Sequence, residues 1–169
     1  MPGTLTPAQD YDHLIEAKAG SDRMHDLHYT AEAASGQDWD RGALVSLNAA
    51  GALVTGCGDH DMPMWAINAT DDFDVDSDIG NFISNKIACW VATGGYELFT
   101  TEYKTTETFA PNDLLTAGLT TDLGLVKLAE TAHSDAVVVG CVSSGVATDV
   151  YSQSILNFWP IFIPKVVTA

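Results

Sequence analysis

The acidic run from residue 71 to residue 78 has the residue types and spacing of a cation-binding loop. Its alternating carboxylates are Asp72, Asp74, Asp76 and Asp78. Hard oxygen ligands at every second position open a calcium loop. The pattern then departs from such a loop, because Ser77 stands where a turn glycine is needed and Ile83 where a bidentate glutamate should close the site. Two interpretations stay open: a looser calcium site, and an acidic surface loop or edge strand.

Cysteine and histidine spacings suggest weaker alternatives. Cys57 and His60 have the spacing that can begin a zinc site, but no second pair at ligand spacing completes the four ligands that structural zinc needs. A glycine-containing turn is the competing interpretation. The same residues with Asp61 could serve a hydrolase, although no G-x-S-x-G elbow occurs. His25 and His28 could bind a metal on one helix face, or could be ordinary exposed histidines.

Composition and charge limit the classes of partner. The chain has 169 residues, of which 46% are hydrophobic, enough for one domain with a core. Its formal net charge is −16, so we expect neither nucleic acid nor an anionic membrane as a partner. Three widely spaced cysteines do not form a disulfide framework, and no leader-like segment opens the sequence. These features predict synthesis in a cytoplasm, with no cofactor.

Short strands and turns fill the sequence from residue 40 onward. Hydrophobic runs rich in strand-forming residues predict strands at 43–47, 52–55, 64–67, 85–91, 96–103, 123–128, 136–141 and 155–164. With no long helix between them, they predict a mainly β fold, either a small β-barrel or a β-sandwich. No internal repeat is apparent in the sequence. We take residues 40–169 as the β-rich body.

Residues 1–39 read differently and predict an extended, partly helical N-terminal arm. Thr6 suits a helix N-cap and Pro7 the first helical position. The segment to Lys18 has a narrow apolar stripe, formed by Tyr11, Leu14 and Ile15. So short a helix is marginal alone in water, so the arm should need a surface to order it.

A second apolar segment lies near the C-terminus, around Pro160 and Pro164. Its large residues are Phe158, Trp159, Ile161, Phe162 and Ile163. Proline removes a backbone donor, so the segment should not be a central strand throughout. It either closes the core or packs against a neighbouring subunit, because tryptophan and phenylalanine are enriched at the buried centres of interfaces.

Five segments of the body resemble the head decoration (cement) proteins of tailed bacteriophages. The early hairpin of that family is similar to residues 40–56, and the block after it to residues 61–67. Residues 109–116 resemble the family's aromatic-x-P-x-D-x-L-T turn, and 138–145 its late V-G-x-V-x-x-G strand. Residues 156–160 fit its closing strand. The resemblance spans about residues 40–164 and leaves out the arm and the Asp-rich run.

The resemblance implies a non-catalytic structural protein on the outside of an icosahedral phage head. It implies docking on the major capsid protein, often as a trimer, which clamps neighbouring capsid subunits. The expected interface residues are Tyr11, Leu14, Ile15, Phe158, Trp159, Ile161 and Phe162. The alternative is a small calcium- or carbohydrate-binding β module, in which Asp72, Asp74, Asp76 and Asp78 hold the cation.

Overall fold

The computed structural model describes residues 15–17, 28–70, 86–92, 95–129, 137–149 and 152–165. These ranges form β1 (Ile15–Ala17), β2 (His28–Glu32), β3 (Leu44–Leu47), β4 (Leu53–Thr55), β5 (Met64–Ala66), β6 (Lys86–Val91), β7 (Leu98–Thr100), β8 (Leu114–Ala117), the 3-10 helix η3 (Thr120–Asp122), β9 (Val126–Leu128), β10 (Val138–Thr148) and β11 (Ser154–Ile163). The expectation of a mainly β fold is confirmed. Within these ranges, no helix is long and apolar enough to cross a membrane.

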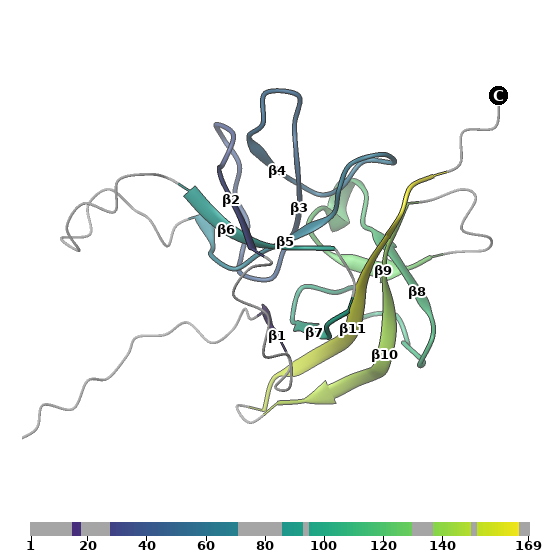
Figure 1. The fold of residues 1–169 in the computed structure, drawn as a ribbon. Helices are drawn as coiled ribbons and strands as arrows, with labels where there is room; N and C mark the ends of the chain where they lie inside the picture. The colour runs from purple at the N-terminus through teal and green to yellow at the C-terminus, as the bar shows by residue number, and fades with distance from the viewer. Residues whose placement is uncertain are drawn as a thin grey trace, which may run out of the picture.

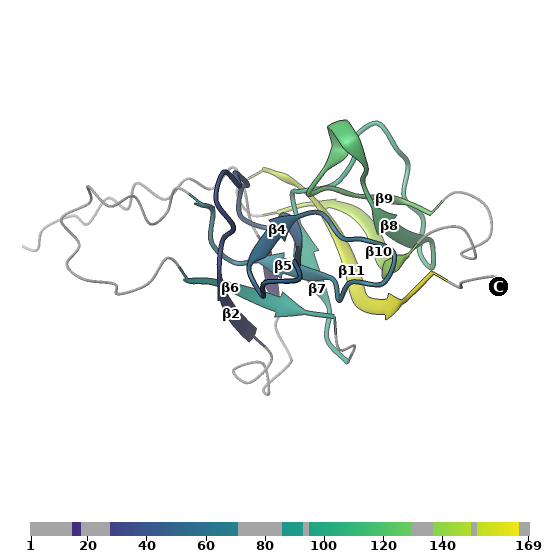
Figure 2. The same ribbon diagram turned by 90° about the horizontal axis from the view of Figure 1, so that it is seen from above.

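The strands form two antiparallel sheets that lie side by side (Figure 1, Figure 2). One has the order β2-β6-β5-β3-β4 and the other β1-β7-β11-β10-β8-β9. After β2 the chain returns to β4, and after β7 it returns to β9, each at one isolated bridge: Ala33 with Leu53, and Tyr103 with Val126. A single bridge is not a paired ladder, so neither sheet closes into a barrel. The barrel expectation is therefore wrong, and two antiparallel sheets replace it.

The helical expectation for the N-terminal arm is also corrected. Ile15–Ala17 form a strand, β1, which pairs with β7 so that Ile15 lies opposite Thr100 and Ala17 opposite Leu98. The narrow apolar stripe gives a helix little to bury, whereas the edge of β7 offers backbone partners and suits a β-branched residue such as Ile15. The rest of the expected helix lies outside the described residues. Both β1 and β2 fall within residues 1–39, yet both pair with strands of the sheets.

The two sheets repeat one connectivity. Replacing β2, β3, β4, β5 and β6 by β7, β8, β9, β10 and β11 converts the order of the first sheet into that of the second, without β1. We call β2–β6 the first unit and β7–β11 the second unit. The pairing registers also agree: Leu44 lies opposite Trp65, and Leu114 opposite Cys141.

Loop hydrogen bonds repeat with the strands. Before β3, the Gly42 N–H donates to Ala66 O over 2.7 Å; before β8, the Asn112 N–H donates to Val142 O over 2.9 Å. Gly42 and Asn112 both have positive φ, at 87° and 72°. Glycine and asparagine tolerate this left-handed conformation best, so two different residues serve the same turn.

A side-chain brace from a loop to the last residue of a strand, β4 or β9, also occurs twice. In the first unit, the Thr55 N–H donates to Gln37 Oε1 over 2.7 Å. In the second, the Leu128 N–H donates to Glu107 Oε2 over 2.6 Å. Because backbone and side-chain bonds recur at equivalent places, the two units share one fold and not merely one strand order.

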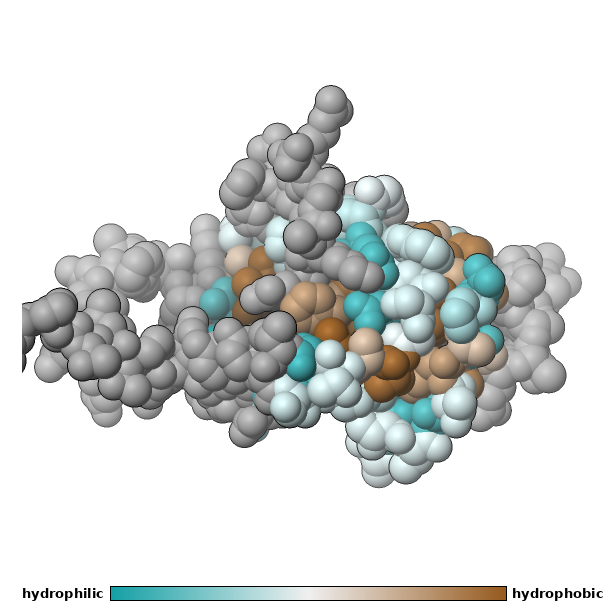
Figure 3. Space-filling view, turned by 90° about the horizontal axis from the view of Figure 1, so that it is seen from below, coloured by the Kyte–Doolittle hydropathy of each residue, from teal (hydrophilic) through white to brown (hydrophobic). Residues whose placement is uncertain are grey.

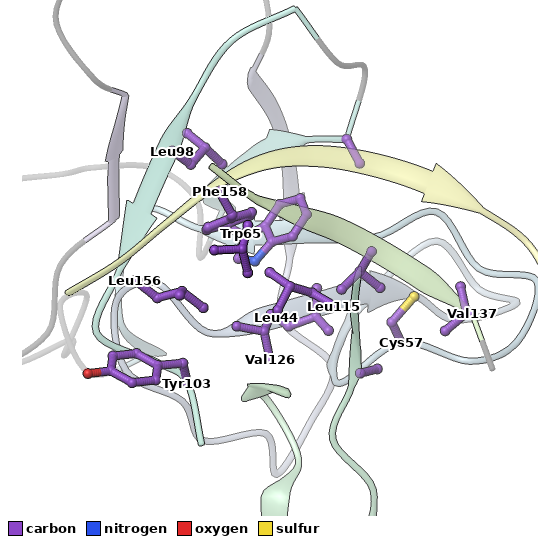
Figure 4. Packing of buried hydrophobic residues seen from close by; sticks show 14 of the residues in the cluster. Leu44, Cys57, Trp65, Leu98, Tyr103, Leu115, Val126, Val137, Leu156 and Phe158 are labelled. Atoms are coloured by element: carbon purple, nitrogen blue, oxygen red, sulfur yellow. The ribbon is translucent and has the colours of Figure 1, made fainter. Parts of the chain in front are cut away.

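Each unit encloses apolar residues, but the two cores are not separate. The first unit's own cluster includes Val45, Leu53, Met64, Ala66 and Ile87. The larger cluster holds the second unit's residues together with Leu44 and Trp65 of the first unit. Figure 4 shows Trp65 beside Phe158, and their ring centroids lie 5.2 Å apart. The first unit therefore inserts side chains into the core of the second.

Candidate docking surface

A row of three apolar side chains crosses the second unit on one face of its sheet. Cys141 on β10 lies opposite Leu114 on β8 and opposite Trp159 on β11. Residues directly opposite in antiparallel strands share a face. Leu114 and Cys141 are half-buried, and Trp159 is 41% exposed. This row, named the outer row, presents apolar area to solvent. Figure 3 shows one face of the molecule, on which apolar (brown) atoms gather between paler and teal ones.

The first unit has an equivalent row, with a different environment. Trp65 lies opposite Leu44 and opposite Trp90, as Cys141 lies opposite Leu114 and Trp159. Leu44 and Trp65 have no exposed surface, and Trp90 packs against the same large cluster. In the first unit this face is thus covered by the second unit. The same face of the second unit has no such cover among the described residues.

The expected C-terminal interface residues divide between core and surface. Phe158 is fully buried, and Phe162 packs partly against the core cluster. Trp159 points to the other face, and Ile161 is half-buried. A register shift between Gly140 and Val138 adds a residue to β11, so simple alternation is not kept beyond Pro160. The segment therefore both closes the core and reaches the surface, and its docking role stays a prediction.

Pro160 lies in β11 without breaking the ladder. It pairs with Gly140 on β10, while the pairing of β11 with β7 covers Leu156 to Phe158 only. At Pro160, then, β11 has a described strand on one side alone. Proline has no N–H to donate, and this lowers the stability of a sheet least where a strand has a neighbour on one side only.

Acidic groups lie near the outer row. Burial, and then the charge of Asp113, raise the pKa of the Cys141 thiol. Ser143, two residues further along β10, is hydrogen bonded to Glu97. A partner of this surface should therefore combine apolar area with basic residues.

The loop at Cys57 forms a tight turn with a buried thiol. Cys57 Sγ donates to Asp61 O over 3.2 Å, and Asp61 Oδ2 accepts from the Gly58 N–H over 3.1 Å. Burial, then the charges of Asp61 and Asp59, raise the pKa of Cys57 to about 12. Zinc ligands and nucleophiles are thiolates, so this geometry favours the turn interpretation. Lys165 Nζ pairs with Asp59 Oδ2 at 3.2 Å and ties the end of the described chain to the turn.

The remaining expected site residues are not brought together. Within the described part of the chain, no group of three or more metal-ligating side chains occurs. His28 lies on β2 opposite Trp90, and Ile15 lies on β1. The residues outside the described ranges are Asp72, Asp74, Asp76, Asp78, Tyr11, Leu14 and His25. The calcium alternative for the Asp-rich run thus remains a prediction.

Sequence reasoning missed Leu114 and Cys141 as surface candidates, because Leu114 lies in a segment that reads as a turn and Cys141 follows an apolar run that reads as core. The available signal was the similarity of Leu114–Ala117 to Leu44–Leu47, two short strands that both begin with leucine. That similarity is too short to reveal that one sheet face occurs twice.

The fold and the outer row define a two-unit β protein in which one apolar face is covered internally and its counterpart has no cover among the described residues. Comparison of the chain with models of known protein families, with curated proteins and with solved structures finds no match.

Proposed function

We propose that this protein is a non-catalytic decoration (cement) protein that docks on the outside of a phage head and stabilises contacts between major capsid subunits. One observation carries the proposal: no described segment covers the outer row of the second unit, where Trp159 is exposed, whereas its counterpart in the first unit is buried. The resemblance of residues 40–164 to phage decoration proteins supplies the identity of the partner. We further propose a homo-oligomer, with a trimer favoured, on the virion exterior, and neither nucleic acid nor membrane as a partner.

The energetics suit a docking role. Tryptophan at the centre of an interface often contributes about 2 kcal/mol or more to binding. A protein that binds only assembled heads stabilises the assembled state by mass action, by about 4 kcal/mol at about 1,000-fold excess over its Kd. The net charge of −16 keeps the free chain soluble despite an exposed tryptophan.

The test is binding to purified heads of the phage whose genome carries this chain. Wild type, Trp159→Glu and Val146→Glu are mixed with heads, and the bound fraction is measured by co-sedimentation. Val146 is the matched control, because it is an exposed apolar residue of β10 (44%) outside the outer row. Trp159→Glu should weaken binding by about 30-fold or more, and Val146→Glu should bind as wild type.

Two results would contradict the proposal. If wild type does not bind heads, the decoration role is wrong. If all three proteins bind equally, the chain docks by a surface other than the outer row.

A further inference from the structure

A carboxylate lies beside Trp159 on the face of the sheet that carries the outer row. Leu98 on β7 lies opposite Phe158 on β11, and successive residues of a strand point to opposite faces. One step further along the two segments, Glu97 and Trp159 therefore share the other face. Trp159 thus has Cys141 on one side, through the pairing of β10 with β11, and Glu97 on the other.

A hydrogen bond that crosses β11 fixes the position of this carboxylate. Ser143 on β10 is hydrogen bonded to Glu97, which directly precedes β7. Because β11 lies between β7 and β10 in the sheet, this bond passes over β11 (Figure 1). Ser143 is two residues from Cys141 and shares its face, which is also the face of Trp159. The carboxylate is therefore held beside an indole that is 41% exposed.

The strands around Trp159 supply no basic side chain to this face. β7, β8, β10 and β11 contain neither lysine nor arginine. Among the described strands of this sheet, β9 has a lysine, Lys127, but it lies opposite Thr116 and not in the outer row. A second acidic residue, Asp113, directly precedes Leu114 at the other end of the row. A cation stacked on Trp159 would therefore come from outside these four strands and would meet negative charge.

An aromatic face beside a carboxylate suits the recognition of an organic cation. A cation within about 6 Å of the centre of a tryptophan ring is attracted by the negative face of the ring. A guanidinium fits such a pair better than an ammonium does, because it is planar, stacks on the ring and bonds a carboxylate through two N–H groups. The charge and shape of this place therefore favour arginine over an uncharged side chain.

We infer that Trp159 and Glu97 bind an arginine side chain of a partner protein, with the guanidinium stacked on the indole and paired with the carboxylate. Ser143 is a positioning residue, since it holds the carboxylate toward the indole. Leu114 and Cys141 would then contact apolar residues next to this arginine. Naming the partner as the major capsid protein rests on the proposed function, whereas the arginine site does not.

The first test uses the full-length chain and a capped glycine-arginine-glycine peptide, without heads. The indole N–H signal of Trp159, assigned by its loss in Trp159→Phe, is followed by NMR as the peptide is added. It should shift with the arginine peptide and not with the matched citrulline peptide, which has the same shape without the charge. Glu97→Gln should weaken this binding by about threefold or more. Glu32→Gln, which removes one charge from β2 of the first unit, should leave it unchanged.

A second test asks whether heads use the same site. Binding of wild type, Glu97→Gln, Trp159→Leu and the double variant is measured by co-sedimentation, and leucine keeps an apolar side chain without an aromatic face. Each single change should weaken binding by about threefold or more. The double variant should lose less than the product of the two losses, because both residues contact one guanidinium.

The outcomes separate the arginine site from the decoration role. Equal shifts with the arginine and citrulline peptides, or no shift with either, would overturn the site. Losses on heads that multiply would also overturn it, because the two residues would then contact separate groups. A response to the arginine peptide in a chain that does not bind heads would support the site and overturn the capsid protein as its partner.

Discussion

Two tryptophans, Trp90 and Trp159, occupy equivalent positions in the two units but have different surroundings. Each lies opposite the central residue of a three-residue row, Trp65 or Cys141. Trp90 packs against the larger core, whereas Trp159 is exposed because no described segment covers its face. What a tryptophan does in this fold is thus decided by what covers its sheet, and not by its own strand.

At the residue scale, neighbours on β11 should separate stability from docking. Phe158→Ala removes a fully buried ring and should lower the free energy of unfolding by about 3–5 kcal/mol. Trp159→Ala should lower it by about 1 kcal/mol or less, since much of the side chain is already in water. Urea denaturation of both variants checks this. Equal losses would show that Trp159 belongs to the core.

Two buried thiols predict alkaline destabilisation. Burial raises the pKa of Cys57 to about 12, with added effects of Asp61 and Asp59, and burial raises the pKa of Cys89 to about 12. Between the ordinary value of 9.0 and about 12, the unfolded chain has lost thiol protons that the folded chain retains. The free energy of unfolding should therefore be intact below pH 9 and fall as pH rises above it.

Urea melts at several pH values measure this slope, with Cys57→Ala/Cys89→Ala as the control. The control is expected to be less stable at neutral pH but to lose less stability between pH 9 and pH 11. Parallel curves for the two proteins would mean that other groups cause the alkaline loss.

At the element scale, the brace from a loop to the end of β4 or β9 is made by different chemistry in the two units. Gln37 accepts the Thr55 N–H with a neutral amide, and Glu107 accepts the Leu128 N–H with a carboxylate. Hydrogen bonds to charged groups contribute more than neutral ones. Glu107→Ala should therefore cost about 1.5–3 kcal/mol in urea denaturation. Gln37→Ala should cost about 1–2 kcal/mol, because the Gln37 amide oxygen also accepts the Thr55 hydroxyl over 3.0 Å.

Glu107→Gln is the matched control, because it keeps an acceptor at the same place. It should recover most of the loss of Glu107→Ala. If Glu107→Gln is as destabilising as Glu107→Ala, the ion pair with Lys104, at 3.9 Å, matters more than the bond to β9.

The sequence predicted some elements well and others poorly, for identifiable reasons. The hairpin β3–β4 was found because apolar runs flank the Asn48–Gly51 turn. β2 was missed since its residues are mostly small or polar, and its partner β6 is far away in the chain. β8 was missed because four residues beside a proline turn read as loop. Ile15 was assigned to a helix because the local periodicity of a sequence carries no information about a strand edge that is distant in the chain, such as that of β7.

The outer row could not be predicted, because it depends on which sheet face is covered. Leu44 and Leu114 are identical at equivalent positions, as are Trp90 and Trp159, but the other equivalent strand positions differ. Two identities do not reveal a repeat. Backbone geometry shows the equivalence that the side chains do not, and exposure then separates the two rows.

At the scale of the whole molecule, the two units differ in the segment that connects their last two strands. β10 and β11 are long and joined by residues 149–153, whereas the shorter β5 and β6 are joined by residues 67–85, which include the Asp-rich run. The core is shared at Trp65, so we expect the units to unfold together and not as independent domains.

Removal of the N-terminal strands should distinguish the strand that the fold can lose, β1, from the strand that it needs, β2. A chain that begins at Lys18 loses β1 but keeps β2, and it should fold. A chain that begins at Asp40 also loses β2, which exposes the edge of β6 and removes Ala31 from its place opposite Ile87, so it should aggregate. Size-exclusion chromatography with light scattering compares the two. A compact, soluble chain from Asp40 would show that β2 is dispensable for the fold.

The most direct test of the account is a cryo-electron microscopy map of phage heads incubated with the full-length chain. We expect the second unit of each bound chain to contact the capsid protein through Leu114, Cys141 and Trp159. A bound chain whose outer row faces solvent would contradict the docking surface. Heads that carry no bound chain would contradict the decoration role itself.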